Sequence, residues 1–152
     1  TMASKFKEQR FATKKKADKR IENSRNEKAV EGDLPKVVFS LKDFDRSQIP
    51  PGQTFEDWEK FGHLSYLMQK LEYISQKNIV EAINEGYIKV YGSFPPNSDF
   101  THPSHIASDV NWAVIMKING QKGRVAGHII NNVFYIVFLD IEHLFYKMKK
   151  RK

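Results

Sequence analysis

Five polar side chains in the last third of the sequence have types and spacing that suit chemistry on a phosphodiester. Two turn signals, Asn119-Gly120 and Asn131-Asn132, predict a meander with strands at about residues 111–118, 122–130 and 133–139. Side chains alternate between the two faces of a strand, so two-residue turns would determine which residues share a face. One face, called here the polar face, then collects Lys117, Lys122, Arg124, His128 and Tyr135.

Cationic side chains on a rigid sheet suit a phosphodiester, because Lys and Arg neutralise phosphate oxygens while a Tyr ring stacks on a base. If the substrate is RNA, cleavage needs no metal. One group removes the 2′-OH proton, a cation stabilises the negative charge at phosphorus, and another group protonates the leaving 5′-oxygen. His128 is the expected acid or base and Arg124 the expected transition-state clamp. The alternative is that both are ordinary residues of a solvated sheet face.

The closing segment 140–152 adds a second set of candidates. His143 and Tyr146 would share one side of a helical turn, whereas in an extended strand they would point to opposite sides. The alternative is that Tyr146 packs against the core and His143 is a surface residue. The basic residues that follow are expected to bind phosphates, namely Lys147, Lys149, Lys150 and Arg151.

No compact set of metal ligands is visible in the sequence. His102 and His105, three residues apart, could bind a metal, but no third ligand is evident. There is no Cys, which excludes thiol catalysis and disulfides. We therefore expect no metal and no cofactor.

Two predicted helices position the meander. Thr54, with Asp57 three residues later, predicts the start of a first helix, in which Trp58, Phe61 and Met68 belong to the buried face. Ser75 or Asn78 predicts the start of a second helix that buries Ile79, Val80 and Ile83 and ends near Gly86. Residues 36–44 begin with a strand, and residues 87–94 form a short extended segment. The fold class is α+β, an antiparallel sheet packed on a helical hairpin.

The face of the meander toward the helices follows from the turns. Two-residue loops pair Ile118 with Gln121 and Ile130 with Val133. The predicted core face comprises Trp112, Val114, Met116, Val125, Ile129, Phe134, Ile136 and Phe138.

The polar face also holds apolar side chains, namely Ile115, Val137 and Leu139. We therefore expect part of it to be covered by the N-terminal arm, by the loop at 95–109 or by a partner protein.

The net charge of +7 is unevenly distributed. Residues 1–28 carry +6 and residues 147–152 carry +5, whereas residues 29–146 carry −4. We interpret residues 1–34 as a basic arm, flexible or ordered by a partner, and residues 35–152 as a single domain. The arm either binds phosphate backbones or is solvated charge. No apolar run is long enough to span a membrane, so we expect a cytoplasmic protein.

The order strand, helix, helix, meander and basic end resembles the RelE/ParE toxin superfamily. The resemblance lies in 37-VVFSLKDF-44, the helical hairpin of 54–86 and 112-WAVIMKINGQKGRVAGHIINNVFYIVFLDIEHLFY-146. It implies a concave sheet face that binds mRNA in the ribosomal A site, with Arg124 at the start of the middle strand and His143 or Tyr146 in the C-terminal catalytic position. It also implies an antitoxin partner. The long arm and the Pro-rich insertion before the meander depart from that family.

These observations predict a metal-independent endoribonuclease toxin of a toxin–antitoxin system that cleaves mRNA, either on the ribosome or free of it. The alternative is a non-catalytic module that binds nucleic acid or protein, because ParE-like members inhibit a topoisomerase and cut no RNA.

Overall fold

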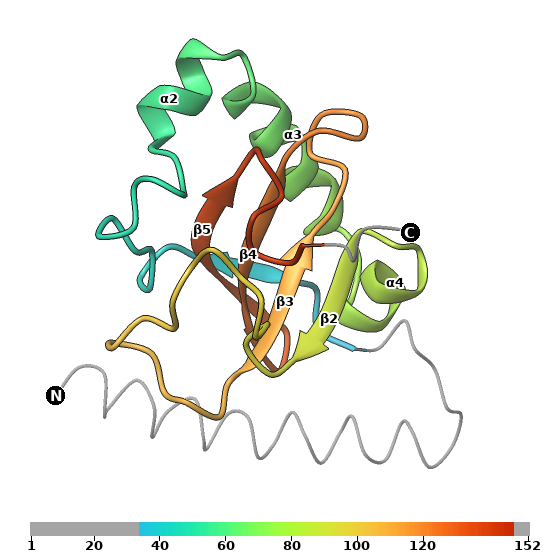
Figure 1. The fold of residues 1–152 in the computed structure, drawn as a ribbon. Helices are drawn as coiled ribbons and strands as arrows, with labels where there is room; N and C mark the ends of the chain where they lie inside the picture. Colours follow the sequence, from blue (N-terminus) through green and yellow to red (C-terminus); the bar gives the residue numbers. More distant parts are fainter. Residues whose placement is uncertain (1–33, 148–152) are drawn as a thin grey trace, which may run out of the picture. The chain divides into compact units, whose positions relative to one another are not determined.

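The computed structural model describes residues 34–147 (Figure 1). The fold is α+β, as predicted, with a five-stranded sheet and helices packed on one of its faces. The longest helix within residues 34–147 has 11 residues, which is too short to cross a membrane. The elements in chain order are β1 (Val38–Ser40), α2 (Phe55–Lys60), α3 (Leu64–Ile74), α4 (Ile79–Asn84), β2 (Ile88–Gly92), β3 (Asn111–Ile115), β4 (Arg124–Ile130) and β5 (Val133–Asp140).

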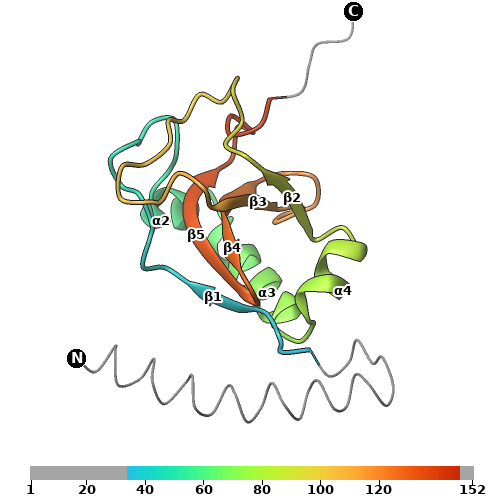
Figure 2. The same ribbon diagram turned by 90° about the horizontal axis from the view of Figure 1, so that it is seen from below.

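The strand order is β1-β5-β4-β3-β2 (Figure 2). The meander β3-β4-β5 is antiparallel, and β2 extends it at one edge, so the extended segment predicted at 87–94 is confirmed. The opening strand β1 runs parallel to β5, which corrects the expectation of a purely antiparallel sheet. A parallel pair needs a long crossover, and the chain between β1 and β5 supplies one that includes α2, α3 and α4.

The region predicted as the first helix forms two helices. Thr54 caps α2 in a capping box with Asp57, as its sequence pattern indicates. The chain then turns at Gly62, whose φ of 81° is in the left-handed region that glycine adopts without strain. Phe61, the C-cap of α2, and Met68 in α3 are 57% and 59% exposed, so their predicted burial is wrong. Because the helix is interrupted at Gly62, the single buried face predicted from one continuous helical spacing does not form.

Helix α4 begins as predicted at the cap Asn78, whose side chain accepts a hydrogen bond from the Glu81 amide. Its end also agrees, because Gly86 has a φ of 82°. Ala82 is the residue buried against the sheet, whereas Ile83 is 38% exposed, so the inward orientation predicted for Ile83 is wrong. One short helix of 6 residues buries a single narrow face.

The first predicted turn is shifted by one residue. Asn119 pairs with Lys122, so Gly120 and Gln121 form the loop, and Ile115 lies opposite Val125. A shift of one residue reverses every side chain of a strand relative to its neighbour. Trp112 and Val114 therefore point away from the helices, and Ala113 and Ile115 point toward them.

The second turn forms as predicted, with Ile130 opposite Val133 and His128 opposite Tyr135. A bulge then interrupts the ladder, because Gly127 pairs with Ile136 but Ala126 pairs with Phe138. The extra residue moves Phe138 to the face away from the helices. Of the predicted core face, Val125, Ile129, Phe134 and Ile136 pack on the helix side, and Trp112, Val114, Met116 and Phe138 pack on the opposite side.

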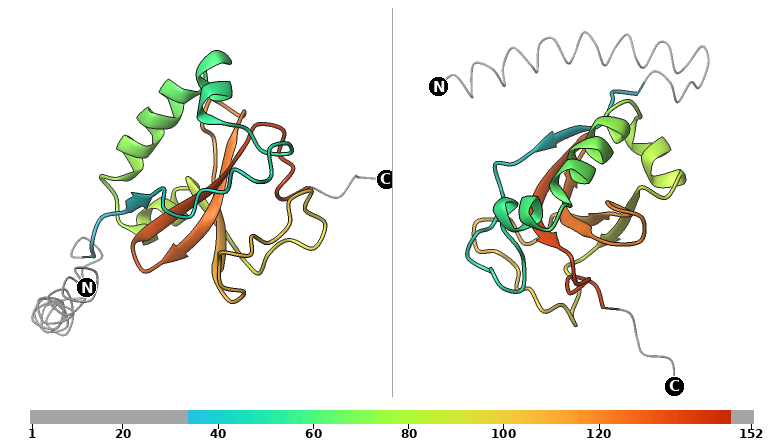
Figure 3. Two further views of the ribbon diagram at one scale, coloured as in Figure 1. Left: turned by 90° about the vertical axis from the view of Figure 1, so that its left-hand side faces the viewer. Right: turned by 90° about the horizontal axis from the view of Figure 1, so that it is seen from above.

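Both faces of the sheet are consequently covered. Helices α2, α3 and α4 cover one face, and the long connection from β2 to β3 crosses the other (Figure 3). This connection, residues 93–110, is called here the covering loop. It contributes Phe100 and Ile106 to a hydrophobic cluster on the face away from the helices, called here the second core, which also includes Trp112, Val114, Phe138 and Phe145. Of the three covers considered for this face, namely the arm, the loop at 95–109 and a partner protein, the structure shows the loop packed on it. The expectation of a solvated polar face is wrong. The reason is that this face holds too many apolar side chains to remain in water.

Candidate functional site

A cavity of about 570 Å³ opens at the end of the sheet where β4 begins and β5 ends. Its volume lies in the range of small-ligand sites. The covering loop does not contribute to its lining. The residues that line it are Lys89, Tyr91, Val114, Met116, Arg124, Asp140, His143, Phe145 and Tyr146.

Arg124 is the first residue of β4, and its Cα lies opposite that of Asp140 at the end of β5. The guanidinium Nη1 is 3.4 Å from the carbonyl oxygen of Gln121 and 3.3 Å from that of Gly123. Both contacts are long for a charged hydrogen bond, and both involve only one of the guanidinium nitrogens. The guanidinium is therefore not held in a short ion pair by any residue within 34–147.

Asp140 holds the segment that follows it, residues 141–146, in the conformation that forms one wall of the cavity. Its carboxylate accepts hydrogen bonds from the Leu144 amide at 2.8 Å and from the Phe145 amide at 2.9 Å. The Phe145 ring is buried in the second core, which anchors the segment. His143 has a φ of 59°, so this segment is not the helical turn that its sequence suggested. His143 and Tyr146 nevertheless line the same cavity.

Strand β2 supplies two residues that the sequence reasoning did not single out. The Tyr91 ring stacks on the Tyr146 ring with centroids 4.2 Å apart and an interplanar angle of 13°. The Nζ of Lys89 lies 5.4 Å from the centroid of the Tyr91 ring. Their spacing was an available signal, because residues two apart in a strand share a face. What the sequence did not reveal is that β2 joins the sheet beside β3.

The cavity favours the neutral form of His143. Burial lowers the pKa of His143, and the charge of Arg124 lowers it further, while Asp140 and Glu142 act in the opposite direction. The Nε2 atom of His143 is buried and has no hydrogen-bond partner among residues 34–147. A neutral imidazole with an uncommitted nitrogen suits a proton acceptor.

Two other groups of the cavity also have shifted pKa values. Burial raises the pKa of Asp140, although the amides of Leu144 and Phe145 partly oppose this effect. Burial and the neighbouring Tyr146 raise the pKa of Tyr91. Both shifts disfavour negative charge inside the cavity. Within residues 34–147, Arg124 and Lys89 are the cations of the lining that can attract an anion.

Three of the four residues predicted to be catalytic thus meet in one cavity, namely Arg124, His143 and Tyr146. His128 does not join them. It lies four residues further along β4, about 13 Å away at the rise of a strand, and it is only 3% exposed. Its Nε2 donates to Asp43 Oδ2 at 2.8 Å, and its ring stacks on Tyr135 at 4.7 Å. The shift in register places Trp112 opposite His128 on the same face, and the covering loop packs over that face. His128, predicted to lie at the surface, is therefore buried.

The remaining predicted phosphate ligands are dispersed. Lys117 and Lys122 lie exposed on the loop between β3 and β4, and neither lines the cavity. Lys147 pairs with Asp99 at 2.6 Å. Tyr135 lies beneath Lys42, whose Nζ is 5.2 Å from the ring centroid. Lys149, Lys150 and Arg151 lie outside the described residues, as does the basic arm up to residue 33.

The pair of His in the covering loop serves structural contacts. His105 Nε2 lies 2.9 Å from the Asp43 carbonyl oxygen, and His102 Nδ1 lies 3.0 Å from the Pro103 carbonyl oxygen. Within residues 34–147 no group of three His, Asp or Glu could hold a metal ion.

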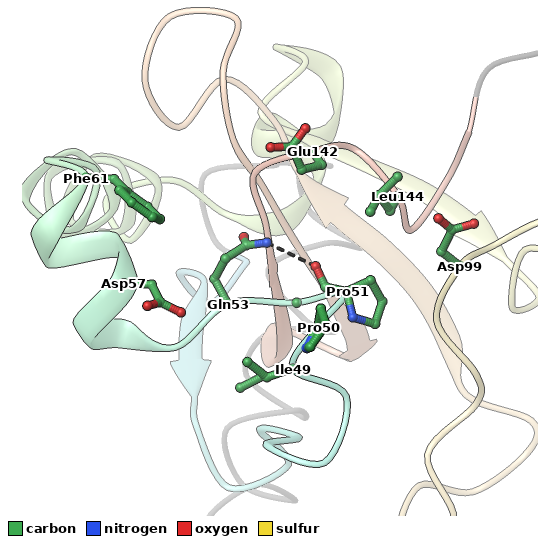
Figure 4. A pocket seen from close by; sticks show the side chains of 10 residues that line it. Ile49, Pro50, Pro51, Gln53, Asp57, Phe61, Asp99, Glu142 and Leu144 are labelled. Carbon is green, nitrogen blue, oxygen red and sulfur yellow. Dashed lines mark hydrogen bonds between the residues drawn. The ribbon is translucent and has the colours of Figure 1, made fainter.

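A second cavity, of about 800 Å³, lies on the other side of the C-terminal segment (Figure 4). Glu142 and Leu144 line it, whereas His143 and Phe145 line the first cavity. Figure 4 shows Asp57, Asp99 and Glu142 around it and the Gln53 side chain bonded to the Pro51 carbonyl oxygen. Among residues 34–147, three carboxyl groups and no cation line this cavity. Such a surface repels a phosphate, so the cavity of Arg124 is the candidate functional site.

The chain matches no protein-family model, no curated protein and no solved structure. The geometry of the Arg124 cavity is therefore the basis for assigning a function.

Proposed function

We propose that the protein is a metal-independent endoribonuclease whose active site is the cavity of Arg124, His143 and Tyr146. The observation that carries this proposal is the convergence of a cation, a neutral imidazole and a phenol on one cavity. These are the three kinds of group that cleavage of RNA by its own 2′-OH requires. Lys89 adds a second positive charge at the same place.

Each residue has one role in this reaction. His143 accepts the proton of the 2′-OH, and the 2′-oxygen attacks phosphorus. Arg124 stabilises the additional negative charge on the phosphoryl oxygens. Tyr146 donates its hydroxyl proton to the 5′-oxygen as the bond from phosphorus to that oxygen breaks. The products are a 2′,3′-cyclic phosphate and a free 5′-OH.

The stacked rings of Tyr91 and Tyr146 support a single-stranded substrate. Tyr146 is 44% exposed, so part of its ring surface is open to a ligand. Bases of a single strand stack on such rings, whereas bases of a duplex are already stacked on each other.

The resemblance to RelE/ParE toxins extends the proposal to a role as a toxin that cleaves mRNA, with an antitoxin as its inhibitor. In this protein the covering loop occupies most of the sheet face that the resemblance assigns to mRNA. We therefore place the RNA at the open end of the sheet beside Arg124, and we expect an antitoxin to block that end.

The second candidate function is RNA binding without cleavage. One observation favours it, namely that His143 Nε2 is shielded from solvent, so a substrate reaches it only after a change of the side chain or of its neighbours. In this case the cavity would hold a phosphate and a base without reaction.

The test is cleavage of a single-stranded RNA oligonucleotide by the full chain in the presence of a metal chelator, compared with the same oligonucleotide made of DNA. The proposal predicts cleavage of RNA only, with cyclic phosphate ends. Arg124→Ala and His143→Gln should abolish cleavage, and Lys122→Ala, an exposed cation outside the cavity, should not. Binding of RNA without any cleavage, also in the presence of ribosomes, would establish the second candidate function.

Growth of a bacterial host that expresses the protein tests the role as a toxin. The wild type should arrest growth, and Arg124→Ala should relieve the arrest while the protein still folds. A wild-type protein that is harmless at high expression contradicts the role as a toxin.

A further inference from the structure

Three buried nitrogen atoms around Trp112 lack a hydrogen-bond partner among residues 34–147. They are Nε1 of Trp112, Nε2 of His102 and Nδ1 of His128. The ring centroids of His102 and His128 lie 5.3 Å and 6.0 Å from that of Trp112. Trp112 and His128 are 0% and 3% exposed. Buried polar groups are almost always hydrogen-bonded, so three unpaired nitrogens on Trp112 and on the two imidazole rings that contact it point to a ligand.

The hydrogen bonds at the other nitrogens determine what this ligand must offer. His102 Nδ1 lies 3.0 Å from the Pro103 carbonyl oxygen, which only accepts, so Nδ1 carries the hydrogen. His128 Nε2 likewise donates to the carboxylate of Asp43. In neutral rings, the unpaired nitrogens of both His are therefore acceptors, while the indole N–H of Trp112 is a donor.

A water molecule has the complementary groups. Its oxygen accepts from the Trp112 indole, and its two hydrogens are donated to the two imidazoles, which gives the three hydrogen bonds typical of buried water. A metal ion fits less well, because the indole N–H of Trp112 offers no lone pair.

We propose that Trp112, His102 and His128 form a binding site for one internal water molecule. The three residues come from β3, the covering loop and β4, so the water joins the loop to the sheet. Trp112 and Phe94 also contact Phe145, with centroids 5.5 Å and 5.3 Å from its ring. The water therefore lies one aromatic layer behind a wall of the Arg124 cavity, and its binding does not depend on RNA cleavage.

The protein contains a matched control for this proposal. It has two Trp residues, and the indole Nε1 of Trp58 donates to Gln53 Oε1 at 3.1 Å. Trp58 is as buried as Trp112. The two indole N–H groups thus differ in whether a residue within 34–147 accepts their hydrogen bond.

The experiment measures nuclear Overhauser transfer from water to the two indole N–H protons in the full chain. We expect the signal of a long-lived water at Trp112 and none at Trp58. Equal signals at both, or none at Trp112, would overturn the proposal, and so would a high-resolution crystal structure in which Trp112 Nε1 donates to a protein atom.

Removal of one acceptor tests the link to the loop. His102→Leu should abolish the signal at Trp112 and accelerate hydrogen exchange of the Ile106 amide, which donates to Pro103, by about tenfold or more. Asn97→Ser, an exposed change in the same loop, should leave both unchanged. A folded His102→Leu protein with an unaltered signal would show that no water bridges these residues.

Discussion

Arg124 lies directly across the β4–β5 ladder from Asp140, so a guanidinium and a buried carboxyl group share the rim of one cavity. Asp140 also accepts the amide hydrogen bonds that shape the segment carrying His143. The residue that would stabilise the transition state and the residue that would accept the proton are thus positioned by the same pair of strand ends.

The first prediction concerns the geometry of the guanidinium. Arg124→Lys keeps the charge but loses the planar fork that binds two phosphoryl oxygens. We expect RNA binding to persist and the cleavage rate to fall by about 10² or more. Single-turnover kinetics separate the two effects, and Lys122→Arg serves as the control. An Arg124→Lys protein that cleaves at the wild-type rate would contradict the role of clamp.

The second prediction is the titration of His143, followed by NMR. Because burial and Arg124 lower the pKa of His143, its midpoint should lie below the ordinary value of about 6.5. Arg124→Gln should raise the midpoint, and Glu142→Gln should lower it further. In the Glu142→Gln protein, the pH at which the cleavage rate falls on the acid side should decrease together with the titration midpoint of His143. A wild-type midpoint at or above about 6.5 would be inconsistent with these surroundings.

The third prediction separates His128 from catalysis. His128→Gln should leave the cleavage rate unchanged, because His128 lies outside the cavity. It should lower the free energy of unfolding by about 1–3 kcal/mol, since it disrupts a buried hydrogen bond to Asp43. Chemical denaturation and cleavage assays on the same preparation test both parts. Loss of cleavage in a protein of unchanged stability would restore His128 to the active site.

The fourth prediction is the pH dependence of the Asp43 contribution to stability. Burial alone would raise the pKa of Asp43, but hydrogen bonds from Lys42 and His128 outweigh it and hold the pKa below its ordinary value. A carboxyl group with a lowered pKa in the folded state stabilises the fold above its unfolded pKa, and this contribution is lost as the pH falls through the folded pKa. Asp43→Asn should therefore be destabilising at pH 7, by about 1–2 kcal/mol.

Denaturation at several pH values measures this contribution. The difference in unfolding free energy between wild type and Asp43→Asn should shrink as the pH falls below about 4. Asp109→Asn, at an exposed site, should show no such trend. A difference that is independent of pH would mean that the charge of Asp43 does not contribute.

The fifth prediction tests the bulge. A Cβ on Gly127 would collide with the Tyr135 carbonyl oxygen and would lie 2.8 Å from Phe134 Cε1. Gly127→Ala should therefore reduce the free energy of unfolding by about 3 kcal/mol or more, because the strands cannot separate without breaking the ladder. Gly120→Asn, in an open turn with a φ of 60°, should change it by less than about 0.5 kcal/mol. Comparable stabilities of the two variants would show that the bulge is not closely packed.

Local chemistry made several features readable from the sequence. The caps Thr54 and Asn78, the glycine at 86 and the turn at 131–132 lie where predicted, because each depends on a few neighbouring residues. The α+β class, the order of opening strand, helical region and meander, and three of the residues of the cavity follow in the same way. The pattern around Arg124, His143 and Tyr146 identified the end of the chain that forms the cavity.

Only the tertiary structure decided which face each strand turns to the helices. One residue of slip between β3 and β4 and one bulge in β5 reverse the parity of the side chains, and the local turn signals do not distinguish these registers. The packing of Trp112 and Phe138 under the covering loop selects the observed registers of β3 and β5. The same packing buries His128. Lys89 and Tyr91 enter the cavity because β2 pairs with β3, a contact between distant parts of the chain. The sequence thus determined which groups are present, and long-range packing determined which of them meet.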